Sequence, residues 1–287
     1  MNLIQRVLDT LTGFLDKVLR ARLLSDASPV SRSPVTLNGA SSFHLLWQME
    51  SEPLEEVSAV LEVLTPPRVD ALYFWALQVE FAEGERGRGG AHVGLQWHPR
   101  FPGSTAVNWG GYAPAEEGGG VLAGSASALP GFEDEPNTLS YDWVPQRSYR
   151  LRVFRAPGSW GWRAEVADLT TGRVDAIRDL YVNATFLRAP VVWAEVFAPC
   201  DAPSVSVRWS GFQARNALGL TVHPRAVVVN YQSARQGGCT NTNVTRDGDG
   251  FVQVTNTERI APLGTRYDVS PVGATGQVGP CTGNAGL

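Results

Sequence analysis

Side chains that can bind a ligand or move a proton fall on one face of a predicted β-hairpin. Apolar residues occupy alternate positions from Tyr73 to Phe81 and again from Ala91 to Trp97, which indicates two strands with one face buried. The polar residues between them then share the opposite face: Gln78, Glu80, His92, Gln96 and His98. Amide, imidazole and carboxylate groups side by side are suited to hydrogen bonding with a polar ligand.

A later strand adds an aromatic ring to this surface. If Val192 and Ala194 face the core in the run PVVWAEVF, Trp193 and Glu195 face away from it. Asn108 and Trp109 in the run AVNWGGY extend the same surface. An indole ring beside such polar groups suits a carbohydrate, whose C–H face stacks on the ring while its hydroxyls are hydrogen-bonded. The alternative is that these are ordinary solvent-facing residues of an antiparallel sheet.

An enzyme hypothesis depends on finding two carboxyl groups across a cleft. Glu80 and Glu195 are the pair that alternation places on one face, and such a pair would favour a polysaccharide-degrading glycosidase or lyase. Glu165 and Asp168 fall on opposite faces of a regular strand and do not form a second pair. Catalysis is therefore left open, with a non-enzymatic role favoured and no catalytic residue assigned.

Metal and cofactor motifs are weak. His92 and His98 could share a metal site with Glu80, but nothing in their spacing requires one. The DGDG run from Asp247 to Gly250 lacks the glutamate that closes a calcium loop, and it predicts a hairpin turn. The chain has no GxSxG motif, and the GERGRGG run lacks the Lys-Ser/Thr of a phosphate loop. We expect no metal and no cofactor.

Composition indicates the architecture and excludes one class of partner. The 287 residues include 30 glycines and 19 prolines and only 18% charged residues, which is typical of an all-β protein with many turns. The formal net charge is −4, so the basic surface that binds phosphates is missing and nucleic acid is not expected as a partner.

The strands that must position these residues follow one another through the middle of the chain. Period-2 runs separated by turns predict about ten short strands between residues 41 and 214, with GERGRGG as the turn of the central hairpin. This number suits a concanavalin-like or jelly-roll antiparallel β-sandwich. We expect its core to hold the apolar side of each run.

The same runs resemble a known family. The order YFWALQVEF, GGAHVGLQWHP, NWGGY, YDWVPQRSYRLRVFR, GWRAEVADLTTG and VVWAEVF is similar to an uncharacterised bacterial family classed as a domain of unknown function. The resemblance covers about Val57 to Ala214. It implies a concanavalin-like sandwich and brings no established activity. Ala91-His92 stands where the family has an aromatic pair.

The N-terminus differs from the rest of the chain. Apolar residues at helical spacing from Leu3 to Leu24 predict an amphipathic helix over residues 1–24, followed by a Ser/Pro-rich linker over residues 25–40. Charged residues interrupt the stretch, so neither a signal peptide nor a transmembrane segment is expected, and the location is cytoplasmic or reached by a non-classical route. Self-association or docking on a protein partner through residues 3–24 is favoured over membrane binding.

The C-terminal part, residues 215–287, is predicted as a small β extension with a flexible tail, either an appendage or additional strands of the sandwich. Cys239 and Cys281 both lie in it, so a bridge between them is one possibility, with Cys200 left over. Three reduced thiols are the other.

Two functions of different classes follow. The leading hypothesis is a non-catalytic, lectin-like module that binds a carbohydrate and is tethered or oligomerised by its N-terminal helix. The alternative is a structural or assembly protein without a small ligand, and glycosidase or lyase activity comes third.

Overall fold

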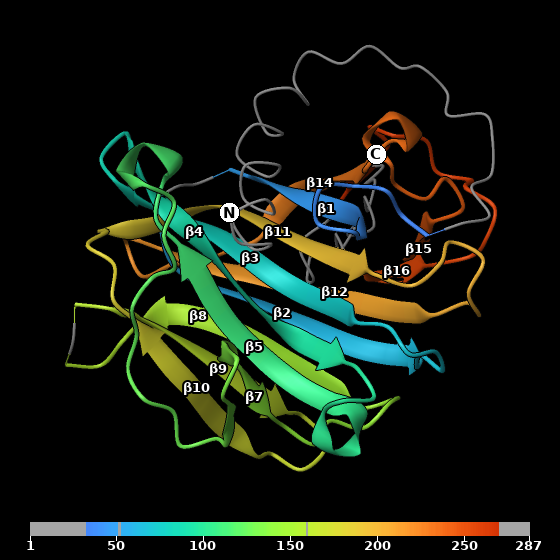
Figure 1. The fold of residues 1–287 in the computed structure, drawn as a ribbon. Coiled ribbons are helices and arrows are strands. Elements are labelled where there is room, and N and C mark those ends of the chain that lie inside the picture. Colours follow the sequence, from blue (N-terminus) through green and yellow to red (C-terminus); the bar gives the residue numbers. More distant parts are fainter. Residues whose placement is uncertain (1–32, 51–52, 159, 270–287) are drawn as a thin grey trace, which may run out of the picture.

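A computed structural model describes residues 33–50, 53–158 and 160–269. These residues form 17 strands, all paired antiparallel, with three short 3-10 turns (Figure 1). The predicted helix over residues 1–24 lies outside the described residues, as do residues 25–32 of the predicted linker and the tail. No helix among the residues described here is both long and apolar enough to cross a membrane.

The strands form two layers. The first sheet has the order β17–β14–β1–β11–β3–β4–β5–β7–β6. Its strands are β1 (Ser41–Met49), β3 (Tyr73–Glu83), β4 (Arg86–Trp97), β5 (Thr105–Tyr112), β6 (Gly131–Phe132), β7 (Glu135–Ser140), β11 (Phe186–Val196), β14 (Pro224–Tyr231) and β17 (Arg266–Asp268). This sheet carries every residue of the predicted binding surface except His98.

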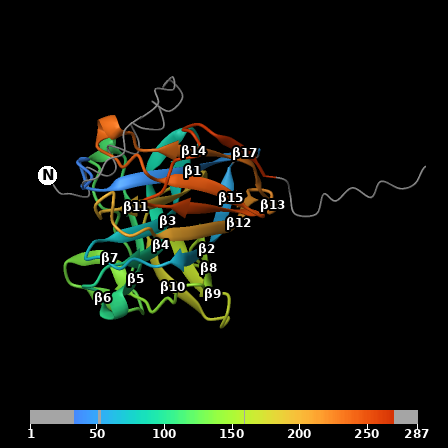
Figure 2. The same ribbon diagram turned by 90° about the vertical axis from the view of Figure 1, so that its right-hand side faces the viewer.

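The second sheet has the order β15–β16–β12–β2–β8–β9–β10, with β13 paired to the end of β12. Its strands are β2 (Leu54–Thr65), β8 (Ser148–Arg155), β9 (Trp162–Asp168), β10 (Val174–Leu180), β12 (Ser206–Asn216), β13 (Thr221–Val222), β15 (Asn243–Asp247) and β16 (Gly250–Val254). In the turned view, β3, β4 and β5 lie to the left of β2, β8 and β9 (Figure 2). The arrangement is a β-sandwich, as the sequence predicts.

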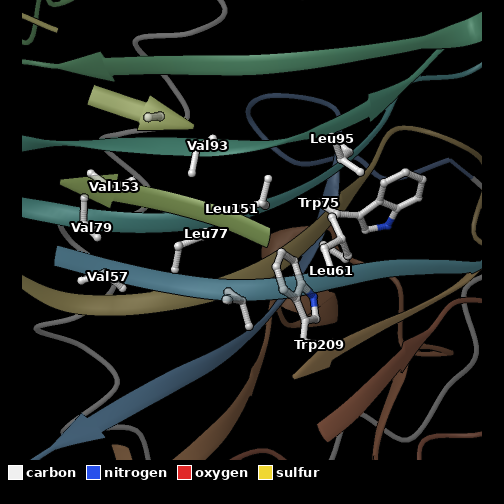
Figure 3. Packing of buried hydrophobic residues seen from close by; sticks show 14 of the residues in the cluster. Val57, Leu61, Trp75, Leu77, Val79, Val93, Leu95, Leu151, Val153 and Trp209 are labelled. Atoms are coloured by element: carbon white, nitrogen blue, oxygen red, sulfur yellow. The ribbon is translucent and has the colours of Figure 1, made fainter. Parts of the chain in front are cut away.

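The core fills the space between the layers. Trp75, Leu77 and Leu95 of the first sheet meet Leu61 and Trp209 of the second sheet (Figure 3). These are the apolar positions of the period-2 runs, and burying them stabilises the fold by roughly 1.5–3 kcal/mol for each large side chain. The packed core holds the first sheet in place, so its other face is available to carry polar groups.

The central hairpin differs from its prediction in the length of its turn. Residues Arg86–Gly90 of the GERGRGG run belong to β4, where Arg86, Gly87 and Gly90 pair with β3, and only Gly84 and Glu85 form the turn. Glycine occurs within a strand where a neighbouring backbone approaches so closely that a side chain would not fit. A Cβ at Gly89 would come within 1.9 Å of the Tyr112 carbonyl oxygen, which explains the glycine there.

The strands after residue 218 take part in both sheets. β14 pairs with β1, and β16 pairs with β12, so this part of the chain completes the sandwich on both sides. The DGDG run forms the turn between β15 and β16, as predicted. A disulfide joins Cys200 to Cys239. This corrects both alternatives drawn from the sequence, a bridge between Cys239 and Cys281 and three reduced thiols. Sequence position could not show that Cys200 is the spatial neighbour of Cys239.

Candidate functional site

Six of the predicted site residues lie on the face of the first sheet that is turned away from the core, called the outer face below. Strand register brings them together because β11, β3, β4 and β5 are neighbours. The six residues are Gln78 on β3, His92 and Gln96 on β4, Asn108 on β5, and Trp193 and Glu195 on β11. Their core-facing neighbours, such as Val93 and Ala194, belong to the main core.

Trp109 does not join them. Its side chain is 0% exposed and packs in the core between the sheets. Adjacent residues of a strand point to opposite faces, so Asn108 and Trp109 could not share one surface. This is a correction to the predicted site.

Glu80 and His98 lie at the margins. Glu80 forms an ion pair with Arg188 at 3.1 Å. His98 follows the end of β4, where its Nδ1 accepts a hydrogen bond from the Arg100 backbone N–H and its Nε2 is 3.9 Å from Asp70. Neither side chain contributes to the centre of the outer face.

Glu195 is the most perturbed carboxyl of this face. It is 8% exposed, and burial raises the pKa of its carboxyl to about 7, although hydrogen bonds from Asn38 and Ser42 oppose the shift. The Asn38 amide donates to Oε1 at 2.8 Å and the Ser42 hydroxyl donates to the same oxygen at 3.3 Å. Burial penalises the charged form of a carboxyl, so Glu195 gains and loses its proton near neutral pH.

Gln96 lies across Phe74 from Glu195. Phe74 on β3 pairs with Glu195 on one side and with Gln96 on the other, so the two Cα atoms are about 10 Å apart at the usual strand spacing. The Phe74 ring turns away from this line, because a Cβ at Gly94 would meet its Cε2 atom at 2.7 Å. The missing side chain at Gly94, in the GLQ sequence, therefore makes room for the Phe74 ring.

Two amide oxygens on this face have no partner among the described residues. They are Oε1 of Gln96 and Oδ1 of Asn108, and both are buried. The Asn108 nitrogen donates to Thr138 Oγ1 at 3.1 Å, which fixes that amide. Buried polar atoms are normally satisfied by protein or water. These two oxygens are therefore free to accept a hydrogen bond from water or from a ligand, although buried indole nitrogens of the core, such as that of Trp109, also have no partner among the described residues.

An aromatic cluster lies on the same face as Glu195 and Gln96. The Phe74 ring meets Trp193 and His92 edge-on, with ring centroids 4.9 and 5.3 Å apart. Trp193 donates its indole N–H to Gln78 Oε1 at 3.1 Å and is only 3% exposed. Burial lowers the pKa of His92 to about 4, so its imidazole is uncharged at neutral pH. The cluster forms an apolar wall rather than the open stacking platform that the sequence predicts for Trp193.

Sequence reasoning missed Asn38, Ser42 and Phe74. Asn38 belongs to the segment predicted as linker, and its turn position gives no sign of a contact with β11. Alternation does place Ser42 and Phe74 on the face opposite the buried Phe43 and Trp75, so the sequence could predict which face they are on. Their position beside Glu195 depends on the register of β1, β11 and β3, which the sequence does not show. Within the described ranges, no group of three or more His, Cys, Asp or Glu residues is arranged to hold a metal ion.

Comparison with known proteins assigns no family. Neither the models of known protein families nor the curated protein sequences match the chain.

Among solved structures, similarity is found to SCP-B, a member of the Eqolisin family of peptidases, in complex with the tripeptide Ala-Ile-His. The sequence identity is 13% and the TM-score 0.40, over 76% of this chain and 98% of that one. Peanut lectin with a bound peptide has 11% identity and a TM-score of 0.26 over 80% and 77%. Tailspike protein 2 of an Escherichia coli O157:H7 bacteriophage has 12% sequence identity and a TM-score of 0.29, over 76% of this chain and 28% of that one. With TM-scores below 0.5, these likenesses assign no activity to this chain.

Proposed function

We propose that the chain is a hydrolase that cleaves acyl bonds, with Glu195 as its acid–base group and Gln96 as the residue that stabilises the negatively charged oxygen. The observation that carries this proposal is the buried Glu195 carboxyl, whose pKa burial raises to about 7, on the same face as the Gln96 amide, whose Oε1 has no partner among the described residues. A carboxyl with a pKa near the working pH is efficient both in taking and in returning a proton.

The proposed reaction needs one water molecule. The Glu195 carboxylate takes a proton from the water, whose oxygen attacks the acyl carbon, and the carbonyl electron pair moves onto the carbonyl oxygen. An N–H of the Gln96 amide donates to that oxyanion, since a carboxamide offers either its oxygen or its nitrogen after rotation about its last bond. The oxyanion then collapses, the bond to the leaving nitrogen or oxygen breaks, and Glu195 gives that atom the proton. An acid and an amine or alcohol are released.

Carboxyl spacing favours this chemistry over glycoside cleavage. Glycosidases hold two carboxyl groups about 5–9.5 Å apart. In the register of β3 with β11, Glu80 lies opposite Arg188, and Glu195 lies opposite Phe74. The two carboxyl groups of the predicted pair, Glu80 and Glu195, are therefore six residues apart along β3, about 20 Å. Acyl hydrolysis requires only one base and one oxyanion donor, which Glu195 and Gln96 supply.

Product release by the purified chain tests the proposal. We expect cleavage of an unfolded protein or of a fluorogenic ester, and a loss of at least about 100-fold in Glu195→Gln and about 100-fold in Gln96→Ala. Glu165→Gln, on the opposite sheet, is the matched control and keeps wild-type activity. Equal rates in Glu195→Gln and wild type, no release from either substrate, or release from polysaccharides alone would contradict the proposal.

Non-catalytic binding of a carbohydrate is the second candidate. It is favoured by the neighbouring free oxygens of Gln96 and Asn108, which two sugar hydroxyls would satisfy. Because Trp193 is buried, a sugar on this face would be held by hydrogen bonds more than by stacking on its indole.

Two measurements test this candidate: binding to a glycan array, and the NMR shift of the Trp193 indole N–H signal when a glycan is added. Binding with a shift of that signal, retained in Glu195→Gln, is the expected result. No array signal and no shift would exclude it.

A further inference from the structure

We propose that Asn38 is a positioning residue for Glu195: it fixes Oε1 of the carboxyl and leaves Oε2 to face the substrate. This inference rests on the proposed hydrolase and goes beyond it, because it assigns a role to the segment before the first strand. Asn38 touches neither Gln96 nor the aromatic cluster in any described contact, so its effect passes through Glu195.

Both hydrogen bonds to Glu195 from described residues end on one oxygen. The Asn38 amide nitrogen lies 2.8 Å and the Ser42 hydroxyl 3.3 Å from Oε1. Two donors on a single oxygen fix the rotation of the carboxyl group about its last bond. The other oxygen is then the one that takes the proton from water.

The Asn38 amide is itself oriented by its own oxygen. Its Oδ1 accepts a hydrogen bond from the Ala40 backbone N–H at 3.2 Å. The Thr36 hydroxyl lies 2.9 Å from the same oxygen and 2.6 Å from the Ala40 carbonyl oxygen, and its single proton is shared between these two acceptors. With the oxygen occupied in this way, the NH₂ group must point toward Glu195. The local turn therefore fixes the orientation of the Asn38 amide, and with it the hydrogen bond to Glu195.

The turn is anchored to the loop that carries the disulfide. The Val35 backbone N–H donates to the Gly237 carbonyl at 3.0 Å, and the backbones approach so closely that a Cβ at Gly237 would lie 2.6 Å from the Val35 carbonyl carbon. The Cys239 backbone N–H donates to Ser41 Oγ at 2.9 Å, and Cys239 is bonded to Cys200. The segment from residue 33 to residue 40 is thus packed against the sheet.

Other titratable groups on the outer face do not obscure a titration of Glu195. They include Glu80 and Arg188, which form an ion pair with each other, and His44 on β1, His92 on β4 and Tyr112 on β5. Burial lowers the pKa of both imidazoles to about 4, and a backbone hydrogen bond with Asn230 partly opposes the shift of His44. Burial, with the charge of Glu195 as a smaller cause, raises the pKa of the Tyr112 hydroxyl well above its usual range. A proton exchanged near neutral pH on this face belongs to Glu195.

The test is the NMR titration of the Glu195 carboxyl carbon in the full chain labelled with ¹³C-glutamate, with the signal assigned by its loss in Glu195→Gln. Asn38→Ala removes the donor and is expected to raise the midpoint by about one pH unit. Asn38→Asp keeps the oxygen that accepts from the Ala40 backbone N–H but replaces the donor with a negative charge, so a larger rise is expected.

Asn241→Ala is the matched control, since Asn241 bonds to the Cys200 carbonyl and not to Glu195; its midpoint is expected to equal that of the wild type. Circular dichroism shows whether each variant is folded, and Ser42→Ala provides a second removal of a donor to Oε1. Unchanged midpoints in Asn38→Asp and Asn38→Ala overturn the positioning role whether or not the wild type hydrolyses a substrate. Shifted midpoints in a chain that releases no product support the contact and overturn only the hydrolase.

Discussion

At the level of single residues, the Glu195 carboxyl is placed where ionisation is opposed. Its pKa of about 7 compares with 4.5 for an ordinary glutamate, because burial outweighs the two hydrogen bonds that favour the charge. Between these values the folded chain keeps a proton that the unfolded chain releases, so this group makes the fold less stable as the pH rises from about 4.5 to 7. A purely structural residue would be better served by an uncharged side chain.

Glu195→Gln is therefore expected to stabilise the protein at pH 8, by up to about 3 kcal/mol, and to have little effect at pH 4.5. Glutamine keeps an oxygen that accepts from Asn38 and Ser42 while it removes the charge. Chemical denaturation of both proteins at the two pH values measures the difference, in which the contributions of His44 and His92 cancel. Equal stability at pH 8 would show that the carboxyl is not strained by burial.

At the level of elements, alternation predicted which side of β3, β4 and β11 faces the core, because each strand has one apolar side. It did not predict the bulge in β11 between Arg188 and Val191, where one extra residue opposes β3. The bulge lets Arg188 and Trp193 share the outer face, although their spacing in sequence would place them on opposite faces. Pro190, within the bulge, was the signal that could have indicated it.

Gly94→Ala is expected to destabilise the protein by about 1–3 kcal/mol, because its Cβ would lie 2.0 Å from the Trp75 carbonyl oxygen and would displace the Phe74 ring. Gly87→Ala in the same strand is the control, since its nearest neighbour is the flexible end of Arg188 at 3.3 Å. Urea denaturation measures both. Similar losses in the two variants would mean that the close approach at Gly94 has no special role.

At the level of the whole molecule, residues distant in sequence build the site. The sandwich class followed from composition and period-2 runs, but which strands are neighbours did not, since pairing depends on long-range contacts that no local pattern records. Ser41 of β1 bonds with Cys239, and Asn38 reaches β11, although the chain between residues 25 and 40 was predicted as a linker. The disulfide was missed for the same reason.

Replacing Cys200 and Cys239 by serine is expected to lower the free energy of unfolding by about 4 kcal/mol, because the bond closes a loop with a sequence separation of 39 residues. Thermal unfolding with and without reductant measures the loss, and Cys281→Ser is the control that should keep wild-type stability. A double variant as stable as the wild type would show that the bond does not constrain the chain.

The most direct measurement of the central claim is the titration of the Glu195 carboxyl in the wild-type chain by ¹³C NMR. The buried position predicts a midpoint near pH 7, where the group can both take and return a proton. A midpoint near 4.5, as for an exposed glutamate, would contradict the assignment of Glu195 as the acid–base residue of this face.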